Sequence, residues 1–304
     1  MARNGVHACT ATGTLRRKEA LHEQYVETPS GQISYVENGT GNSLAALFVH
    51  GVLLNGYLWR HQLTGLGDTR RCIAVDLLAH GSTNIKPDQD VAYDAQALML
   101  KQFLDTLRID RVDLVGNDSG GAIAQIFAAN YPERVRSFTL TDCDAHDNWP
   151  PEAVKDFLQL VARGGLKGAL ETMLADRAFV RSDQGFGLWY ERAADVADDT
   201  FATYLRPLVS SPARVRDLER FFAAWDNKQT VRIEQKLRAL TVPTLIVWGT
   251  DDVFFDVKWS HWLARTIPGT KRRVEYAGAR LLFPEERPKQ FNEDLRAHFM
   301  SCLA

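Results

Sequence analysis

The stretch Leu-Val-Gly-Asn-Asp-Ser-Gly-Gly-Ala-Ile-Ala-Gln, residues 114–125, decides the fold. An apolar run leads into Asp118, and small residues that are compatible with a helix follow it. Gly116 stands two residues before Asp118, and Gly120 stands two residues after it. Glycines at these two places allow a strand to turn tightly into a helix and to expose the side chain between them. The stretch therefore predicts a strand, a sharp turn at Asp118 and a helix.

Asp118 and Ser119 are both candidates for the exposed side chain at this turn. Around Asp118, both flanking positions are glycine. Around Ser119, they are Asn117 and Gly121, so the spacing favours Asp118. An alternative is that the glycines serve only helix–strand packing in a dinucleotide-binding unit. Their order is not G-x-G-x-x-G, which argues against that alternative.

Strand and helix signals alternate on both sides of this stretch. Short β-rich runs that end near Gly, Asn or Asp predict strands, and apolar residues at helical spacing predict helices. The predicted strands are 32–37, 45–50, 71–77, 112–116, 137–141, 243–249 and 272–276, and the predicted helices beside them are 92–107, 122–131 and 288–303. This alternation predicts an α/β fold with a mostly parallel, doubly wound sheet.

The middle of the chain shows almost no strand signal. The helices predicted there are 151–162, 166–174, 199–208 and 214–225. We therefore expect an N-terminal tail over 1–23, a first part of the core over 24–144, a helical cap over 145–231 and a second part of the core over 232–304. Insertions of this kind usually cover a site. The cap carries aromatic residues that are candidates for lining a pocket: Trp149, Phe186, Trp189, Tyr190 and Trp225.

Composition excludes several classes of function. The 304 residues are 45% hydrophobic and 24% charged, which is ordinary for a globular protein. A net charge of −2 gives no electrostatic attraction to nucleic acid or to an anionic membrane. The four cysteines lack metal-binding spacing, and the first residues lack the apolar core of a signal peptide. We expect a cytoplasmic protein with a small-molecule substrate, no organic cofactor and no metal ion. The sequence does not indicate an oligomeric state.

Three further segments resemble the α/β-hydrolase fold family. Phe-Val-His-Gly at 48–51 resembles the segment after the third strand of that family. Asp-Leu-Leu-Ala-His-Gly-Ser at 76–82 is similar to its D-x-x-G-H-G-x-S loop, and Trp-Gly-Thr-Asp-Asp at 248–252 resembles its W-G-x-x-D element. With the turn at Asp118, these segments follow the order of the family. The resemblance covers the two predicted parts of the core.

The resemblance implies an α/β-hydrolase fold with an inserted helical cap, and it implies roles for particular residues. Asp118 takes the nucleophile position, and Asp252 takes the position of the supporting acid. The backbone N–H groups of Val52 and Ser119 would form an oxyanion hole. An aspartate at the nucleophile position resembles haloalkane dehalogenases and epoxide hydrolases. Dehalogenases usually have Asn and Trp where this chain has Val52 and Ser119, and epoxide hydrolases usually have proline where it has Leu53.

The catalytic histidine of the family is missing from its usual place after the last strand. Aligning Glu-Arg-Pro at 286–288 with the family's E-x-P element puts Leu281 at this place, and a slip of one residue puts Arg280 there. Neither side chain is a base at pH 7.

His146 is the candidate replacement, because it follows the strand after the turn. His50 and His80 fit ordinary loop positions of the family, so we expect structural roles for them. Some dehalogenases carry their acid at the end of the same strand that precedes His146. Asp142 or Asp144 could therefore serve as the acid.

Three functions stay open. An ionised Asp118 can attack carbon without a base, whereas Ser119 needs one. The first hypothesis is therefore a hydrolase of a small apolar molecule with a carbon–halogen, epoxide or ester bond. The second is a lyase, isomerase or cyclase that uses Asp118 as a general base. The third is a ligand-binding protein without turnover, which would tolerate Asp118→Asn.

Overall fold

The computed structural model describes residues 21–303. Of the tail expected over 1–23, residues 1–20 lie outside the described residues. Among the residues that are described, no helix combines the length and the apolar character needed to cross a membrane.

The core is one eight-stranded sheet with the order β1-β2-β4-β3-β5-β6-β7-β8. The strands are β1 (Glu23–Thr28), β2 (Gly31–Asn38), β3 (Ala45–Val49), β4 (Arg71–Val75), β5 (Val112–Asp118), β6 (Val135–Cys143), β7 (Thr244–Gly249) and β8 (Thr270–Tyr276). Strand β2 pairs antiparallel with both β1 and β4, and every other pairing is parallel. The predicted doubly wound, mostly parallel sheet is confirmed.

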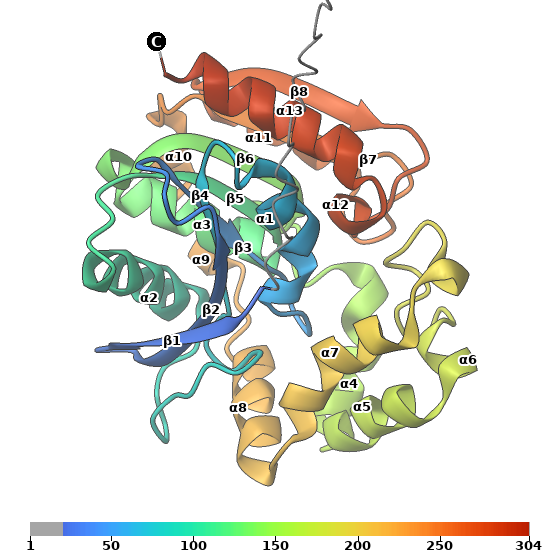
Figure 1. The fold of residues 1–304 in the computed structure, drawn as a ribbon. Helices are drawn as coiled ribbons and strands as arrows, with labels where there is room; N and C mark the ends of the chain where they lie inside the picture. The colour runs from blue at the N-terminus through green and yellow to red at the C-terminus, as the bar shows by residue number, and fades with distance from the viewer. Residues whose placement is uncertain (1–20, 304) are drawn as a thin grey trace, which may run out of the picture.

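Two groups of helices flank the sheet (Figure 1). Helix α1 packs against α13, while α2 packs against α3, α3 against α10 and α10 against α11. Their bounds are α1 (Arg60–Leu66), α2 (Tyr93–Thr106), α3 (Ser119–Asn130), α10 (Glu234–Arg238), α11 (Lys258–Thr266) and α13 (Pro288–Ser301). A short helix, α12 (Phe283–Glu286), precedes α13.

A helical segment joins β6 to β7. It contains η3 (Glu152–Val154), α4 (Lys155–Ala162), α5 (Leu166–Ala175), α6 (Arg177–Val180), η4 (Ala193–Asp195), α7 (Asp198–Val209), α8 (Pro212–Ala223) and α9 (Lys228–Val231). Figure 1 shows α4, α5, α6 and α7 grouped together at one end of the molecule. We call residues 145–231 the cap.

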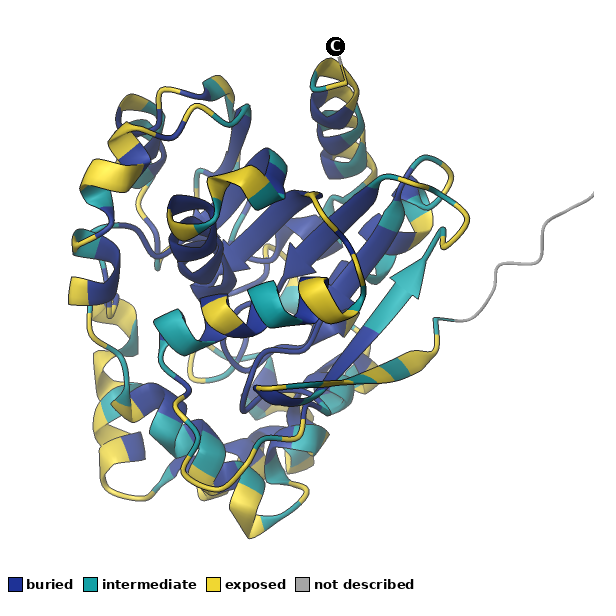
Figure 2. Cartoon of the chain, turned by 90° about the vertical axis from the view of Figure 1, so that its left-hand side faces the viewer, coloured by how far each residue is buried: buried dark blue, intermediate teal, exposed yellow. Residues whose placement is uncertain are grey.

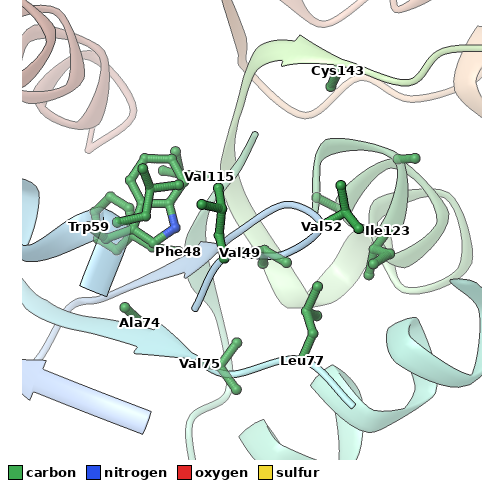
Figure 3. Packing of buried hydrophobic residues seen from close by; sticks show 14 of the residues in the cluster. Phe48, Val49, Val52, Trp59, Ala74, Val75, Leu77, Val115, Ile123 and Cys143 are labelled. Carbon is green, nitrogen blue, oxygen red and sulfur yellow. The ribbon is translucent and has the colours of Figure 1, made fainter. Parts of the chain in front are cut away.

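The centre of the sheet is buried along whole strands. Every residue of β3 and of β7 is buried, because helices cover both faces of these parallel strands. Figure 2 shows this as a dark-blue centre, with exposed residues mainly on the surrounding helices. Figure 3 shows part of the packing, including Val49 and Val115 on the neighbouring strands β3 and β5.

Strand β5 turns directly into α3, and this junction positions the site. The strand ends at Asp118 and the helix begins at Ser119, three residues earlier than the sequence predicts. Gly120 is needed because a Cβ there would lie 2.5 Å from the backbone oxygen of Val49, on β3. Only a residue without a side chain lets the first turn of α3 pack this closely against the neighbouring strand.

Candidate active site

Asp118 adopts a backbone conformation that residues other than glycine rarely adopt. Its φ is 56° and its ψ is −133°. Strain of this kind persists only where the surrounding structure enforces it, and it gathers at functional sites. Gly51 makes room for the carboxyl group, since a Cβ on Gly51 would lie 2.6 Å from Cγ of Asp118. Asp118 is 5% exposed.

Two backbone N–H groups hold one carboxyl oxygen of Asp118. Val52 donates to Oδ1 at 3.4 Å, and Ser119 donates to the same oxygen. The structure thus brings together the three residues that the sequence assigns to the nucleophile and the oxyanion hole. Oδ2 of Asp118 accepts no hydrogen bond from a backbone N–H group among the described residues. Burial raises the pKa of Asp118, and the N–H of Ser119 opposes this rise.

Asp252 and Asp142 form a carboxyl pair near this turn. Oδ1 of Asp252 accepts hydrogen bonds from the backbone N–H groups of Phe254 (2.7 Å) and Phe255 (3.1 Å). Asp142 accepts one from Gly249 at 2.9 Å. The two carboxyl groups also hydrogen-bond to each other, which requires a proton between them.

Both members of this pair have raised pKa values. Burial raises the pKa of Asp252 to about 7, although two backbone N–H groups oppose the rise. Burial, followed by the charge of Asp252, raises the pKa of Asp142 well above its usual range. The pair therefore keeps a proton at a pH where an exposed carboxyl group would have lost it.

The stability of the fold is expected to decrease as pH rises through neutrality. Asp252 has a pKa of about 7 in the folded protein, against about 3.9 in an unfolded chain. The stabilisation that comes from binding this proton more tightly in the folded protein is complete below the pKa of the unfolded chain. It is lost as pH rises through the pKa of the folded protein. From pH 5 to pH 8, the free energy of unfolding should fall by about 2 kcal/mol. Urea unfolding at both pH values measures this, and Asp252→Asn should show a smaller fall. An equal fall in the variant would contradict the prediction.

A third buried carboxyl group, Asp144, follows β6. The Tyr93 hydroxyl, at the start of α2, donates to its Oδ2 at 3.1 Å. Burial, followed by the negative charge of Asp118, raises the pKa of Asp144 well above its usual range. Oδ1 of Asp144 and Oγ of Ser119 are both buried, and neither has a hydrogen-bond partner of good geometry among residues 21–303.

His146 does not contact Asp118. Its Nε2 lies 3.0 Å from Oε2 of Glu234, and its Nδ1 lies 3.2 Å from Oδ1 of Asp147. The ring packs against Trp262 with centroids 4.9 Å apart. The backbone of His146 has a φ of 51°. A role for His146 as the replacement base stays a prediction, and these contacts offer it no support.

His50 and His80 are buried in the loops beside the site. The backbone N–H of Leu77 donates to Nε2 of His50 at 3.0 Å. Burial lowers the pKa of His50 to about 3 and that of His80 to about 4. Both rings are therefore neutral at physiological pH, as structural roles require.

Leu281 is buried at the place where the family has its histidine. Its backbone oxygen accepts a hydrogen bond from Nδ2 of Asn117 at 3.1 Å, so the residue before Asp118 fixes this loop. Arg280 instead donates to the backbone oxygen of Gly187, in the cap, at 3.3 Å. Neither residue supplies a base to the site.

The loop that carries Leu281 is fastened to the cap by backbone hydrogen bonds. The N–H of Leu282 donates to the oxygen of Trp189 at 3.0 Å. The N–H groups of Glu191 and Arg192 donate to the Glu286 carboxylate at 2.7 Å and 2.8 Å. These bonds fix one edge of the cap to the core.

A buried carboxylate, Glu285, strengthens the same edge. The hydroxyl groups of Tyr190 (2.8 Å) and Tyr204 (3.1 Å) both donate to its Oε2, and Arg60 forms an ion pair with it. The tyrosines belong to the cap, whereas Arg60 and Glu285 belong to the core. Nothing in the sequence pattern marks this group, because its members come together only in the folded chain.

A small apolar pocket lies between the cap and the loop after β3. Val52 and Leu53 line one side, and η3, α4 and α8 contribute to the other. Three of the five aromatic cap residues named from the sequence line it: Phe186, Trp189 and Trp225. Its cavity volume is about 90 Å³. The other two do not line it, because Trp149 stacks on Tyr93 and Tyr190 binds Glu285.

Comparisons with known proteins agree with this architecture. The family model described as alpha/beta hydrolase fold matches residues 47–287. The monoacylglycerol lipase abhd6-A of Xenopus laevis is 24% identical over 303 residues, which cover 95% of this chain and 85% of that protein. The haloalkane dehalogenase 2 of Mycobacterium tuberculosis is 27% identical over 242 residues, which cover 78% of this chain and 81% of that protein.

Solved structures show the same fold. The structure of the epoxide hydrolase CorEH without ligand superposes with a TM-score of 0.76 at 18% identity, over 93% of this chain and 99% of that one. The family match spans most of the chain, and the sheet, the turn at Asp118 and the cap have the arrangement that the sequence predicts. The protein belongs to the α/β-hydrolase fold family.

Proposed function

We propose that this protein is a hydrolase of a small, largely apolar organic molecule and that Asp118 is its nucleophile. The observation that carries the proposal is the position of the Asp118 carboxyl group. It stands on a strained turn, and two backbone N–H groups bind one of its oxygens. An ionised carboxylate needs no base in order to attack carbon.

In the proposed reaction, Oδ2 of Asp118 attacks an electrophilic carbon of the substrate. With a haloalkane or an epoxide, the bond from that carbon to the halide or to the ring oxygen breaks, and an ester forms between the carbon and Asp118. With an ester substrate, attack at the acyl carbon releases the alcohol, which takes its proton from water, and leaves an anhydride on Asp118. Water then hydrolyses the ester or the anhydride and restores the carboxylate. The N–H groups of Val52 and Ser119 stabilise the negative oxygen that develops when water attacks the ester carbonyl.

The pocket supports a small apolar substrate. Its walls are mainly aliphatic and aromatic side chains, among them Phe157, Phe222 and Phe254. A pocket of this composition favours apolar groups, because their burial removes apolar surface from water. The haloalkane dehalogenase and the monoacylglycerol lipase among the relatives support a carbon–halogen or ester bond as the one broken. The site chemistry adds epoxides to these two classes.

Intact-protein mass spectrometry tests the nucleophile directly. The protein is incubated with a panel of haloalkanes, terminal epoxides and activated esters, beside the variants Asp118→Asn and Ser119→Ala. We expect a mass increase that matches covalent attachment of one substrate. The increase should be absent in Asp118→Asn and should remain in Ser119→Ala, because the serine hydroxyl has no base to activate it.

The opposite pattern would contradict the proposal. An adduct that persists in Asp118→Asn and disappears in Ser119→Ala would make Ser119 the nucleophile. If no member of the panel gave either adduct or product, covalent hydrolysis would be ruled out for these substrates.

A second candidate is a proton-transfer reaction with Asp118 as general base. The raised pKa of Asp118, which follows from its burial, favours this candidate. It would give product without any adduct, and Asp118→Asn would abolish the product. A ligand-binding protein would instead retain its ligand affinity in Asp118→Asn.

A further inference from the structure

Four carboxyl groups gather around the turn, and the described part of the chain provides no basic side chain to pair with any of them. They belong to Asp118, Asp142, Asp144 and Asp252, and the charge of Asp118 raises the pKa of both Asp144 and Asp252. Buried carboxylates without a cation are costly, so such groups retain protons instead. The carboxyl groups beside Asp118 can therefore hold protons while Asp118 itself is ionised.

Asp144 is the member of this set whose backbone lies next to the nucleophile at the edge of the sheet. Cys143 is paired with Asp118 across β5 and β6, so Asp144 lies one residue beyond that level at the same edge of the sheet. Nε2 of Gln125, on α3, donates to the backbone oxygen of Asp144 at 2.8 Å. The helix that begins at Ser119 thus holds Asp144 in place.

The contacts of Asp144 fit a neutral carboxyl group with one hydrogen to donate. Oδ2 accepts from the Tyr93 hydroxyl. Oδ1 is buried in a residue that is only 1% exposed, and no hydrogen bond of good geometry reaches it among the described residues, although the Ser119 hydroxyl lies beside this carboxyl group. A charged carboxylate with one poorly satisfied buried oxygen is destabilised, whereas an Oδ1–H group can donate to the Ser119 hydroxyl or to a substrate oxygen.

We propose that Asp144 acts first as the acid and then as the base of this site, and that the substrates it suits are epoxides. The inference rests on Asp118 being the covalent nucleophile. When Oδ2 of Asp118 attacks an epoxide carbon, the carbon–oxygen bond breaks and the ring oxygen takes the proton of Asp144. The products of this step are a hydroxyalkyl ester on Asp118 and a carboxylate on Asp144.

The second step uses that carboxylate. Asp144 takes one proton from a water molecule while the water oxygen attacks the ester carbonyl of Asp118. The ester bond breaks, a diol leaves with the second oxygen protonated by the water hydrogen that remains, and both carboxyl groups return to their first state. One residue thus supplies the proton transfers for which the family uses its histidine, which explains how position 281 can be leucine.

The same reasoning separates epoxides from haloalkanes. A halide leaves without a proton, so attack on a haloalkane would leave Asp144 still protonated and unable to act as a base. The ester on Asp118 would then persist. We therefore expect continuous turnover of an epoxide, whereas a haloalkane should release at most one equivalent of halide per protein molecule and leave its carbon chain on Asp118.

Tyr93 is a positioning residue in this scheme. Its hydroxyl hydrogen bond to Oδ2 stabilises the Asp144 carboxylate that exists between the two steps. Its ring stacks on Trp149 with centroids 4.5 Å apart and an interplanar angle of 8°. Tyr93→Phe therefore removes the hydrogen bond and keeps the stacking.

The test follows the adduct on Asp118 over time by quenched-reaction mass spectrometry, with styrene oxide and other terminal epoxides as one arm. Phenylethyl bromide, which has a similar carbon skeleton, forms the second arm. In Asp144→Asn we expect adduct formation from the epoxide to slow by about 10²-fold or more, which is the usual contribution of general acid catalysis. The adduct that does form should persist, because no carboxylate is present at position 144 to activate water. Tyr93→Phe should slow adduct formation, the step that creates the Asp144 carboxylate, by less than Asp144→Asn does.

Each outcome bears on one proposal. No adduct and no diol from any epoxide with the unaltered protein would overturn the nucleophile, and with it this inference. An epoxide adduct that forms and decays at the same rates in Asp144→Asn would overturn the inference and leave the nucleophile standing. Sustained release of phenylethanol from the bromide would also overturn it.

Slow adduct decay in His146→Gln, with normal decay in Asp144→Asn, would transfer the base role to His146. Thermal unfolding of each variant checks that its fold is intact.

Discussion

Replacing Leu281 with histidine is expected to speed hydrolysis of an ester on Asp118 by about 10²-fold, because it restores a general base at the place where the family has one. Leu281 is buried, and its backbone is held by Asn117, the residue before Asp118. Oδ2 of Asp252 is buried and accepts no N–H group in residues 21–303, so it could receive the imidazole N–H in addition to its contact with Asp142. The effect should be largest for an alkyl bromide, whose adduct the unaltered protein is expected to retain.

The measurement is the rate at which the adduct mass disappears after excess reagent is removed. Leu281→Gln is the matched control, since it introduces a polar side chain of similar length that is not a base at pH 7. Equal acceleration in the glutamine variant and in the histidine variant would show that polarity alone matters. No acceleration by histidine would show that position 281 does not face the ester.

Replacing Gly120 with alanine is expected to destabilise the fold by about 3 kcal/mol, at the upper end of the cost of overpacking a buried site. The new Cβ would lie 2.5 Å from the backbone oxygen of Val49, and it would also contact that of His50. Backbone at the end of β3 cannot move aside as a flexible side chain could. The displaced loop carries Val52, so adduct formation should weaken together with stability.

Urea unfolding measures the change, and Gly168→Ala is the control. Gly168 lies inside α5 on the exposed surface, and a Cβ there meets nothing within 4 Å. Alanine at that position should stabilise the protein by about 0.5–1 kcal/mol, because glycine is unfavourable within a helix. A similar result for both substitutions would mean that Gly120 is not required for close packing.

The sequence predicts the turn at Asp118 because all the information for it is local. An apolar run, two glycines and a helix-compatible stretch lie within twelve residues. The seven strands β2–β8 are also predicted, since each contains a short, β-rich run. The sequence analysis misses β1, an edge strand whose residues alternate between exposed and half-buried and include charged side chains. It also misses α1 and α10, which are too short to show a clear helical period.

Contacts between distant segments could not be predicted in the same way. Tyr93 and Asp144 are 51 residues apart, and Tyr190 and Glu285 are 95 apart. Their contacts depend on how helices and loops pack over the sheet, which no local pattern encodes. The strand end next to His146 could be predicted, but the contact of its ring with Glu234 could not. The role of Asp142 was open in the sequence, and only the fold pairs it with Asp252.

Hydrogen bonds join residues 187–192 of the cap to the loop around Leu282. They hold the cap more firmly to the core at this edge than at the opposite one. Lifting the cap at that edge would break backbone hydrogen bonds and separate Glu285 from its tyrosine partners in the cap. The walls formed by η3 and α4 are the least buried helical parts of the pocket, because η3 has no buried residue and α4 has one, Val161, while Val154 and Phe157 reach the pocket. We therefore expect small molecules to enter and leave past η3 and α4 rather than past the edge that is bonded to the loop around Leu282.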